Sequence, residues 1–223
     1  MNINLSPRLL AAASLIRGGG IVADIGTDHG YLPIYLIQQG KIPGAIAADI
    51  GKQPLENAAK SVYQYGLTDK IELRLSDGLV AFSPDDASEF VIAGMGGTLI
   101  AQILGNSQWI KDSRYHFVFQ PQSRAEELRE YLYNNGFEIG REIVCCEGRR
   151  YYLALDAVYT GVNTPYTQAE CFLGKMEPSQ ESAEYIRRQI SRLTKKYEAL
   201  GDESPQKSDL LKTLDELREF TND

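Results

Sequence analysis

Strand-like and helix-like segments alternate along the first 160 residues of this chain of 223 residues. Apolar runs such as "GIVADIG", "GAIAADI" and "EFVIAGMGG" are each followed by a segment with helical spacing. Continuous apolar runs are typical of strands buried on both faces, and helical connections join parallel strands. The alternation therefore predicts an α/β fold with a mostly parallel sheet and helices on both of its faces.

The last strand signals break this alternation. Residues 137–161, "FEIGREIVCCEGRRYYLALDAVYTG", indicate two long strands joined through Glu147 and Gly148, with no helix between them. Such a pair predicts an antiparallel hairpin at the edge of the sheet. A βα series that ends in a hairpin is the Rossmann-like architecture of class I S-adenosylmethionine-dependent methyltransferases, and we expect it for residues 1–160.

Helix signals occur at both ends of this predicted domain and beyond it. In "LSPRLLAAASLI", Ser6 is a predicted N-cap before Pro7, and this helix is expected to cover an edge of the sheet near the ligand cleft. Ser123 and Gly136 are predicted to begin and end a later helix. Over residues 161–223 we predict a coiled-coil-like helical hairpin, with "GDESP" between its helices. Its apolar stripes are Ile186, Ile190, Leu193, Tyr197 and Leu200, then Leu210, Leu214, Leu217 and Phe220.

Composition limits the class of protein. The net charge of −7 argues against a protein that coats nucleic acid, although local basic patches remain possible. Three cysteines, two of them adjacent, give neither a disulfide framework nor a zinc-binding spacing, so we expect no metal. No apolar run approaches the roughly 20 residues that a membrane span needs. We expect a cytoplasmic protein that binds no membrane.

Acidic and glycine residues follow the predicted strands one after another. Asp24 and Gly26 end the first strand, Asp49 ends the second, and Asp77 follows the third. Open α/β sheets bind ligands beyond the carboxyl ends of their strands. Asp24 is placed to face an amine or another cation, Asp49 the hydroxyls of a ribose, and Asp77 an adenine amino group. Together these positions predict a nucleoside held across the strand ends.

The loop after the first strand argues against a phosphate ligand. In "ADIGTDHGYLP", Asp28 occupies a place where a dinucleotide-binding loop presents its backbone to pyrophosphate. The phosphate-binding pattern GxxxxGK[ST] is absent from the chain. A carboxylate there favours a ligand with positive charge, such as the sulfonium and amine of S-adenosylmethionine.

Several motifs occur in the order of one known family. "ADIGTDHGYLPIYL", "GAIAADI", "VIAGMGGTLIAQIL", "FQPQ" and "YYLAL" resemble the bacterial tRNA (adenine-22-N1)-methyltransferase family, TrmK. The resemblance covers the whole chain, and its C-terminal part matches by layout more than by letters. Two motifs depart from the family pattern: "AAD" stands for "AGE", which keeps the carboxylate, and Gln122 stands for asparagine. The resemblance implies transfer of a methyl group from S-adenosylmethionine to N1 of an adenine in tRNA.

The resemblance also implies site residues. Arg8 is expected near the cofactor carboxylate, with Asp24 and Gly26 at the methionine end of the cofactor. The remaining expected contacts are Asp49 and Ile50 at the ribose, Asp77 and Gly78 at the adenine, Ala93, Gly94 and Met95 along the cofactor, and Gly96 and Gly97, next to Met95, beside the target base.

The histidines receive different interpretations. Methylation places positive charge on the adenine, which a carboxylate stabilises, so Asp28, His29 and Tyr31 are candidate catalytic residues. The alternative is that Asp28 and His29 cap the following helix. His116 precedes an apolar strand and is interpreted as structural.

A tRNA substrate requires cationic contacts. The candidates are Arg149, Arg150, Arg187, Arg188, Arg192, Lys195 and Lys196. A solvated helix face is the alternative for those after residue 180. Two other functions stay open: a methyltransferase of the same fold that acts on another RNA or a small molecule, and a non-catalytic S-adenosylmethionine-binding module.

Overall fold

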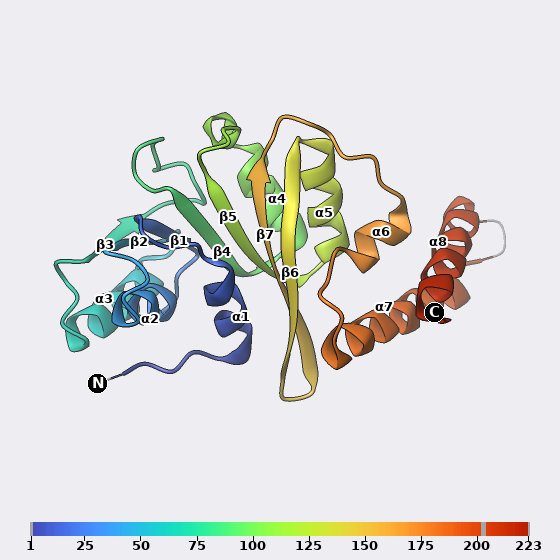
Figure 1. The fold of residues 1–223 in the computed structure, drawn as a ribbon, viewed down its shortest axis with the longest axis horizontal. Helices are drawn as coiled ribbons and strands as arrows, with labels where there is room; N and C mark the ends of the chain where they lie inside the picture. Colours follow the sequence, from blue (N-terminus) through green and yellow to red (C-terminus); the bar gives the residue numbers. More distant parts are fainter. Residues whose placement is uncertain (1, 202–203, 223) are drawn as a thin grey trace.

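The computed structural model describes residues 2–201 and 204–222 and contains one seven-stranded sheet in the order β3-β2-β1-β4-β5-β7-β6 (Figure 1). β7 is antiparallel to both of its neighbours, whereas the pairs from β3 to β5 are parallel. The predicted parallel sheet with an antiparallel edge hairpin is therefore confirmed. The strands are β1 (Val22–Ile25), β2 (Ala45–Asp49), β3 (Ile71–Leu75), β4 (Glu89–Gly96), β5 (His116–Ser123), β6 (Phe137–Glu147) and β7 (Arg150–Tyr159).

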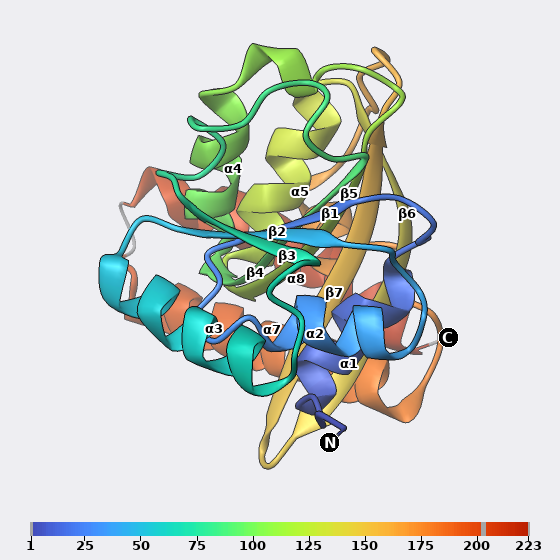
Figure 2. The same cartoon turned by 90° about the vertical axis from the view of Figure 1, so that its left-hand side faces the viewer.

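Helices cover both faces of this sheet, as Figure 2 shows. One face carries α1 (Pro7–Leu15), α2 (Tyr31–Gln38) and α3 (Lys52–Gln64). The other carries α4 (Gly97–Gly105), a short 3₁₀ helix (Gln108–Ile110) and α5 (Ala125–Asn134). Each layer encloses its own apolar core, because the apolar runs of the central strands send side chains to both faces. The α1 helix packs against β5, β6 and β7, as expected for a helix that covers the edge hairpin.

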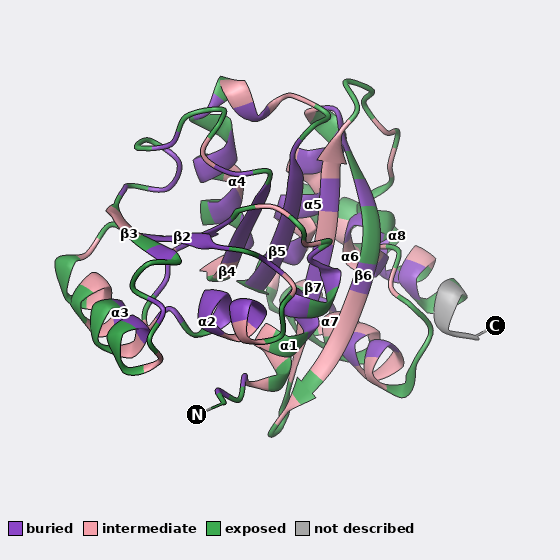
Figure 3. Cartoon of the chain, turned by 60° about the vertical axis from the view of Figure 1, so that its left-hand side comes forward, coloured by how far each residue is buried: buried purple, intermediate pink, exposed green. Residues whose placement is uncertain are grey.

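Burial along the strands explains this arrangement. All four residues of β1 and the first residues of β4 and β5 are buried, which Figure 3 shows as a continuous buried centre of the sheet. In β6, exposed and buried residues alternate at the start of the strand, as expected at a sheet edge. The parallel register places Ile25 beside Ala48 and Ile92, so the loops after β1, β2 and β4 emerge together.

Two predicted helix caps differ from the structure. Ser6 occupies the N-cap position of α1, but its side chain makes no capping hydrogen bond. Ser123 does not begin α5, because β5 remains paired with β4 as far as Ser123 and the N-cap residue is Arg124. Arg124 has φ 56° and is the one non-glycine residue with positive φ in the described part of the chain. The expected end of this helix near Gly136, with φ 75°, is confirmed.

The C-terminal region contains α6 (Gln168–Leu173), which the sequence patterns did not predict, then α7 (Gln180–Ala199) and α8 (Pro205–Asn222). The two predicted apolar stripes meet in a small core around Leu193, Leu214 and Leu217. Residues 202–203 of the predicted loop and the side chain of Phe220 lie outside the described residues. Cys171 and Tyr185 belong to the apolar core that also contains residues of α4 and α5. Residues before and after position 160 therefore pack in one core. A helical unit that folds separately over residues 161–223 therefore stays a prediction.

A buried ion pair holds this region to the sheet. Arg129 of α5 donates two hydrogen bonds to the Glu142 carboxylate of β6, at 2.8 and 2.9 Å. Arg129 also donates to the Cys171 carbonyl at 2.7 Å, and the Lys175 backbone N–H donates to Glu142 at 3.0 Å. A Cβ at Gly174 would overlap the Glu142 carboxylate, so only glycine fits there.

The same segment covers part of the sheet edge. Met176 forms a parallel β-bridge with Glu142, and the backbone N–H of Glu177 donates to the Glu142 carbonyl at 3.1 Å. The α7 helix packs against β6 and β7 as well as against α8. The chain after β7 therefore folds back along the outer strand of the sheet.

His116 lies at the opposite end of the strands from the loops after β1 and β4. Its Nδ1 lies 2.7 Å from Glu89 Oε2 and its Nε2 lies 2.8 Å from Asp156 Oδ2. Burial alone would lower the pKa of His116, but the two carboxylates outweigh burial and raise that pKa. This buried network agrees with the interpretation of His116 as structural.

Candidate active site

A cavity of 380 Å³ opens at the carboxyl ends of β1 and β4, where the parallel register brings their loops together. Its lining includes eight of the residues predicted to form the site: Arg8, Asp24, Gly26, Asp28, His29, Tyr31, Ala93 and Gly94. Five other residues also line it, Leu9, Thr27, Gly30, Leu32 and Gln122, and of these the sequence patterns gave no signal for Leu9, Thr27 and Leu32. The cavity lies where an open α/β sheet binds its ligand.

Asp24 is buried at the base of this cavity. Its pKa is raised from 3.8 to about 6; burial is the main cause, the hydrogen bond with Thr27 opposes the rise, and the negative charge of Asp49 adds to it. No lysine, arginine or histidine among the described residues forms an ion pair with Asp24. A buried carboxylate with a raised pKa and no cation beside it favours a positively charged ligand.

Two of the residues that line this cavity are glycines with positive φ. Gly26 and Gly94 have φ 80° and 85°, a region that L side chains rarely adopt. A Cβ on Gly26 would overlap the thioether of Met95, so Met95 supports the loop from beneath and does not line the cavity. A Cβ on Gly94 would instead make ordinary contacts with Gln122 Nε2 at 3.6 Å and Arg8 Nη1 at 3.7 Å, so both side chains lie beside this glycine.

Arg8 reaches the cavity from α1. Its Nη1 donates to Gln120 Oε1 at 3.4 Å, and its backbone N–H donates to Glu147 Oε2 at 3.4 Å. Gln120 is fully buried and also accepts a hydrogen bond from the Gly94 N–H at 3.2 Å. Gln120 therefore holds the guanidinium of Arg8 and the loop after β4 in one arrangement.

The three candidate catalytic residues lie together at the mouth of the cavity. His29 Nε2 lies 3.3 Å from Asp28 Oδ2, and the rings of His29 and Tyr31 are stacked with centroids 5.0 Å apart. The side chain of Asp28 is 69% exposed, so a substrate can reach it. The α2 helix begins after Gly30, whose N–H donates to Thr27 Oγ1 at 3.1 Å. Among the described residues, Thr27, and neither Asp28 nor His29, therefore accepts the N–H of the N-cap residue Gly30.

The residues expected at the ribose and adenine lie outside the cavity, along the ends of β2 and β3. Asp49 Oδ1 accepts a hydrogen bond from the Gly51 N–H at 2.7 Å, and Ile50 is 67% exposed. Asp77 is exposed beyond β3, whereas Gly78 is buried, where a Cβ would lie 2.8 Å from Ile103. These residues continue from the cavity along the strand order β1-β2-β3.

Gly96 and Gly97 do not line the cavity. A Cβ on Gly97 would overlap the carbonyl oxygen of Arg124, and one on Gly96 would lie 3.3 Å from Ser123 Oγ. Close packing between the starts of α4 and α5 therefore explains Gly97 without a ligand. The predicted contact of both glycines with substrate remains a prediction.

The residues predicted to form a cationic surface fall into two groups, those paired with acidic side chains and those without an acidic partner in the described ranges. Arg187 and Arg188 both pair with Glu184, and Arg192 pairs with Glu126 at 2.8 Å. Arg188 also donates to the Arg149 carbonyl at 2.8 Å, which joins α7 to the turn of the β6–β7 hairpin. The exposed residues without an acidic partner in the described ranges are Arg149, Arg150, Lys195 and Lys196.

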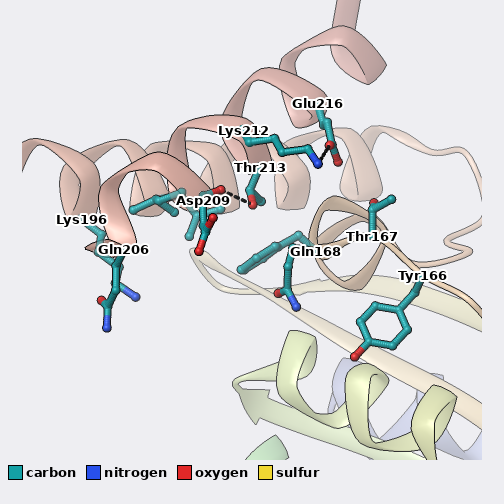
Figure 4. Close-up of a pocket in the computed structure, with 12 residues that line it drawn as sticks. Tyr166, Thr167, Gln168, Lys196, Gln206, Asp209, Lys212, Thr213 and Glu216 are labelled. Carbon is teal, nitrogen blue, oxygen red and sulfur yellow. Dashed lines mark hydrogen bonds and ion pairs between the residues drawn. The ribbon is translucent and has the colours of Figure 1, made fainter. Parts of the chain in front are cut away.

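A larger cavity of 570 Å³ lies among α6, α7 and α8, with Lys196, Asp209 and Lys212 among its lining residues (Figure 4). None of the residues predicted to bind the cofactor at the carboxyl ends of the parallel strands lines this cavity, so we do not assign the active site to it. Within the described ranges, no helix is long and apolar enough to cross a membrane. The same residues contain no group of three or more histidine, cysteine or acidic side chains placed to hold a metal.

Comparison with known proteins agrees with this geometry. Residues 5–155 match the family model described as a methyltransferase domain. The chain is 30% identical to the tRNA (adenine(22)-N(1))-methyltransferase of Bacillus subtilis (strain 168), over 99% of this chain and 94% of that protein.

Solved structures show the same likeness. A protein of the NADB-Rossmann superfamily from Streptococcus agalactiae superimposes with a TM-score of 0.88 and 32% identity, covering 99% of both chains. TrmK of M. capricolum, in complex with S-adenosyl-homocysteine, superimposes with a TM-score of 0.81 and 27% identity, covering 98% of both chains. The chain therefore belongs to the methyltransferase family that includes the B. subtilis tRNA (adenine(22)-N(1))-methyltransferase.

Proposed function

We propose that this protein transfers the methyl group of S-adenosylmethionine to N1 of an adenine in tRNA, adenine 22 in the numbering used for its B. subtilis relative. The buried Asp24 carries the proposal, because its raised pKa and the lack of a described cationic partner fit the ammonium group of this cofactor. Since tRNA is the substrate, we place the activity in the cytoplasm.

The residues around Asp24 fit the rest of the cofactor. Arg8 at the cavity wall is placed to pair with the cofactor carboxylate, and Asp49 has a second oxygen for the ribose hydroxyls. Ile50 and Asp77 lie farther along the strand ends, where an adenine ring would extend. When bound there, S-adenosylmethionine supplies an activated methyl group on a sulfonium.

The cavity mouth suits the target base. Adenine N1 attacks with an in-plane lone pair and needs no general base, and the product ring carries a positive charge. Asp28 is placed to stabilise that charge, and the stacked rings of His29 and Tyr31 offer a flat surface for a base. Because N1 lies on the pairing edge, the base must leave its pair to react.

Incubation of the protein with labelled S-adenosylmethionine and unmodified tRNA, followed by nucleoside analysis, tests this function. We expect label in 1-methyladenosine, and none when adenine 22 is replaced by guanine. Label in another nucleoside, or none in any tRNA, would contradict the proposal.

Asp49→Ala is expected to weaken S-adenosylmethionine binding at least about tenfold, because hydrogen bonds to an ionised carboxylate contribute about 1.5–3 kcal/mol. Titration calorimetry measures this effect. Asp49→Asn keeps an acceptor for Gly51 but removes the charge, and should weaken binding in the same direction. Asp69→Ala, at an exposed position, is the control. Parent affinity in both Asp49 variants would exclude the ribose contact.

Asp28→Asn is expected to reduce the rate of methyl transfer on the order of 10²-fold while cofactor affinity persists. Asp28 lies at the cavity mouth, and only interactions stronger in the transition state accelerate the chemical step. Single-turnover rates on tRNA at saturating S-adenosylmethionine provide the measurement. A rate within about threefold of the parent, or weakened cofactor binding, would assign Asp28 a different role.

A further inference from the structure

A second, smaller cavity lies beside the candidate active site. It has a volume of 130 Å³ and lies between the end of β5, the start of β7 and the inner side of α7. Gln122 lines both this cavity and the one that contains Asp24. The two cavities therefore share Gln122 as a lining residue, although α7 begins nearly sixty residues after Gln122 in the sequence.

One of the residues that line this cavity carries a buried acceptor without a partner. The Oε1 atom of Gln189, on α7, has no hydrogen-bond partner among the described residues. A buried amide oxygen without a donor is costly, and native proteins rarely leave one unpaired. Ser6 Oγ is also unpaired, but Ser6 lines neither this cavity nor the one that contains Asp24. The arrangement therefore favours a ligand that brings an N–H or O–H donor.

The walls of the cavity suit a flat aromatic ring. Tyr151, Leu153 and Tyr185 contribute rings and an apolar side chain, and the guanidinium of Arg188 lies 4.6 Å from the centroid of the Tyr151 ring. Nucleobases stack on aromatic side chains with little dependence on sequence. These three side chains, together with the unpaired acceptor of Gln189, fit a nucleobase, whose amino or ring N–H groups are donors.

The rim of the cavity carries cations that suit the adjoining backbone of an RNA. Arg124 and Arg192 both line it, and they pair with Glu127 and Glu126 on α5. Arg124 is held at φ 56°, and a non-glycine residue in this region is strained. Such strain concentrates at ligand-binding positions, which agrees with a binding role for this rim.

We propose that this cavity binds a nucleobase adjacent to the target adenine, and that Gln189 Oε1 accepts a hydrogen bond from that base. The inference rests on the proposed function, since it assigns a second contact to the same tRNA. Extrusion of the adenine into the first cavity displaces its neighbour as well, and the second cavity holds that neighbour. Gln189 is therefore a specificity residue for the tRNA and makes no contact with the cofactor.

Gln189→Leu removes the acceptor and keeps a side chain of similar size. We expect KM for tRNA to rise about tenfold, with kcat and S-adenosylmethionine affinity unchanged. The thermal midpoint should not fall, because the change removes a buried polar atom without a partner. Gln180→Leu, at the exposed first residue of α7, is the matched control and should behave as the parent.

Two tRNAs, each abasic on one side of the target adenine, complete a thermodynamic cycle. For one of them we expect the parent to lose about tenfold in kcat/KM, and Gln189→Leu to show no further loss. Two results would show that water alone fills the cavity. One is an equal loss of kcat/KM in the parent and the variant for both tRNAs, and the other is a KM for tRNA in the variant that equals that of the parent. If the parent methylates no tRNA, the proposed function fails. Equilibrium tRNA binding by the parent and by Gln189→Leu then tests separately whether this cavity binds a nucleobase.

Discussion

Asp24→Asn is expected to stabilise the ligand-free protein by about 2–3 kcal/mol at pH 7 and to abolish S-adenosylmethionine binding. Burial raises the pKa of Asp24 from 3.8 to about 6, so the folded state binds this proton more tightly than the unfolded state. Stability therefore falls as the pH rises from about 4 to about 6, by about 3 kcal/mol in total. Asparagine keeps the shape and the hydrogen bond with Thr27 but has no charge to bury.

Thermal unfolding of the parent and Asp24→Asn between pH 4 and pH 7 measures this effect. The difference between the two midpoints should be about 5–10 °C at pH 7 and should shrink towards zero near pH 4. Asp69→Asn, at an exposed aspartate, should show no such trend. A variant less stable than the parent at pH 7, or one that still binds S-adenosylmethionine, would contradict the role assigned to Asp24.

Arg129→Met is expected to destabilise the protein by about 3–5 kcal/mol, since it leaves the fully buried Glu142 carboxylate without its cation. The variant also loses the hydrogen bond to the Cys171 carbonyl, so the segment that leads into α7 loses part of its attachment. The double variant Arg129→Met/Glu142→Leu removes both charges and should recover most of the loss, because an apolar pair of similar volume often replaces a buried ion pair.

Urea unfolding of both variants provides the measurement. The control is Arg141→Met, which breaks the exposed ion pair with Glu177 and should change stability by less than about 1 kcal/mol. If Arg129→Met were no less stable than that control, the buried pair would not hold the C-terminal region. Equal losses in the single and the double variant would mean that packing, and not the unpaired charge, determines the effect.

The sequence predicts the sheet and its helices well because local signals and the global fold agree. Apolar runs that end in Asp24, Asp49 and Gly94 mark the carboxyl ends of strands, and parallel pairing then brings those ends together. The hairpin through Gly148 follows from two strand patterns with no helix between them. These inferences need only periodicity and turn chemistry.

The rest of the site depends on contacts between distant residues. The role of Gln120 was not predicted, because an amide inside an apolar run acquires its role only when Arg8 and the Gly94 N–H lie beside it. The raised pKa of Asp24 requires a burial that no pattern of letters measures. The expectation that Ser123 begins α5 was wrong, because its pairing with Gly96 extends the strand as far as the serine.

The bridge between Met176 and Glu142 also bears on the solubility of the protein. β6 is an outer strand of 11 residues, and an uncovered edge of that length is a template for pairing with another molecule. The returning chain occupies the middle of this edge with its own backbone hydrogen bond. The segment after α6 thus protects against edge-to-edge aggregation, a contribution that is independent of tRNA and persists in the absence of any ligand.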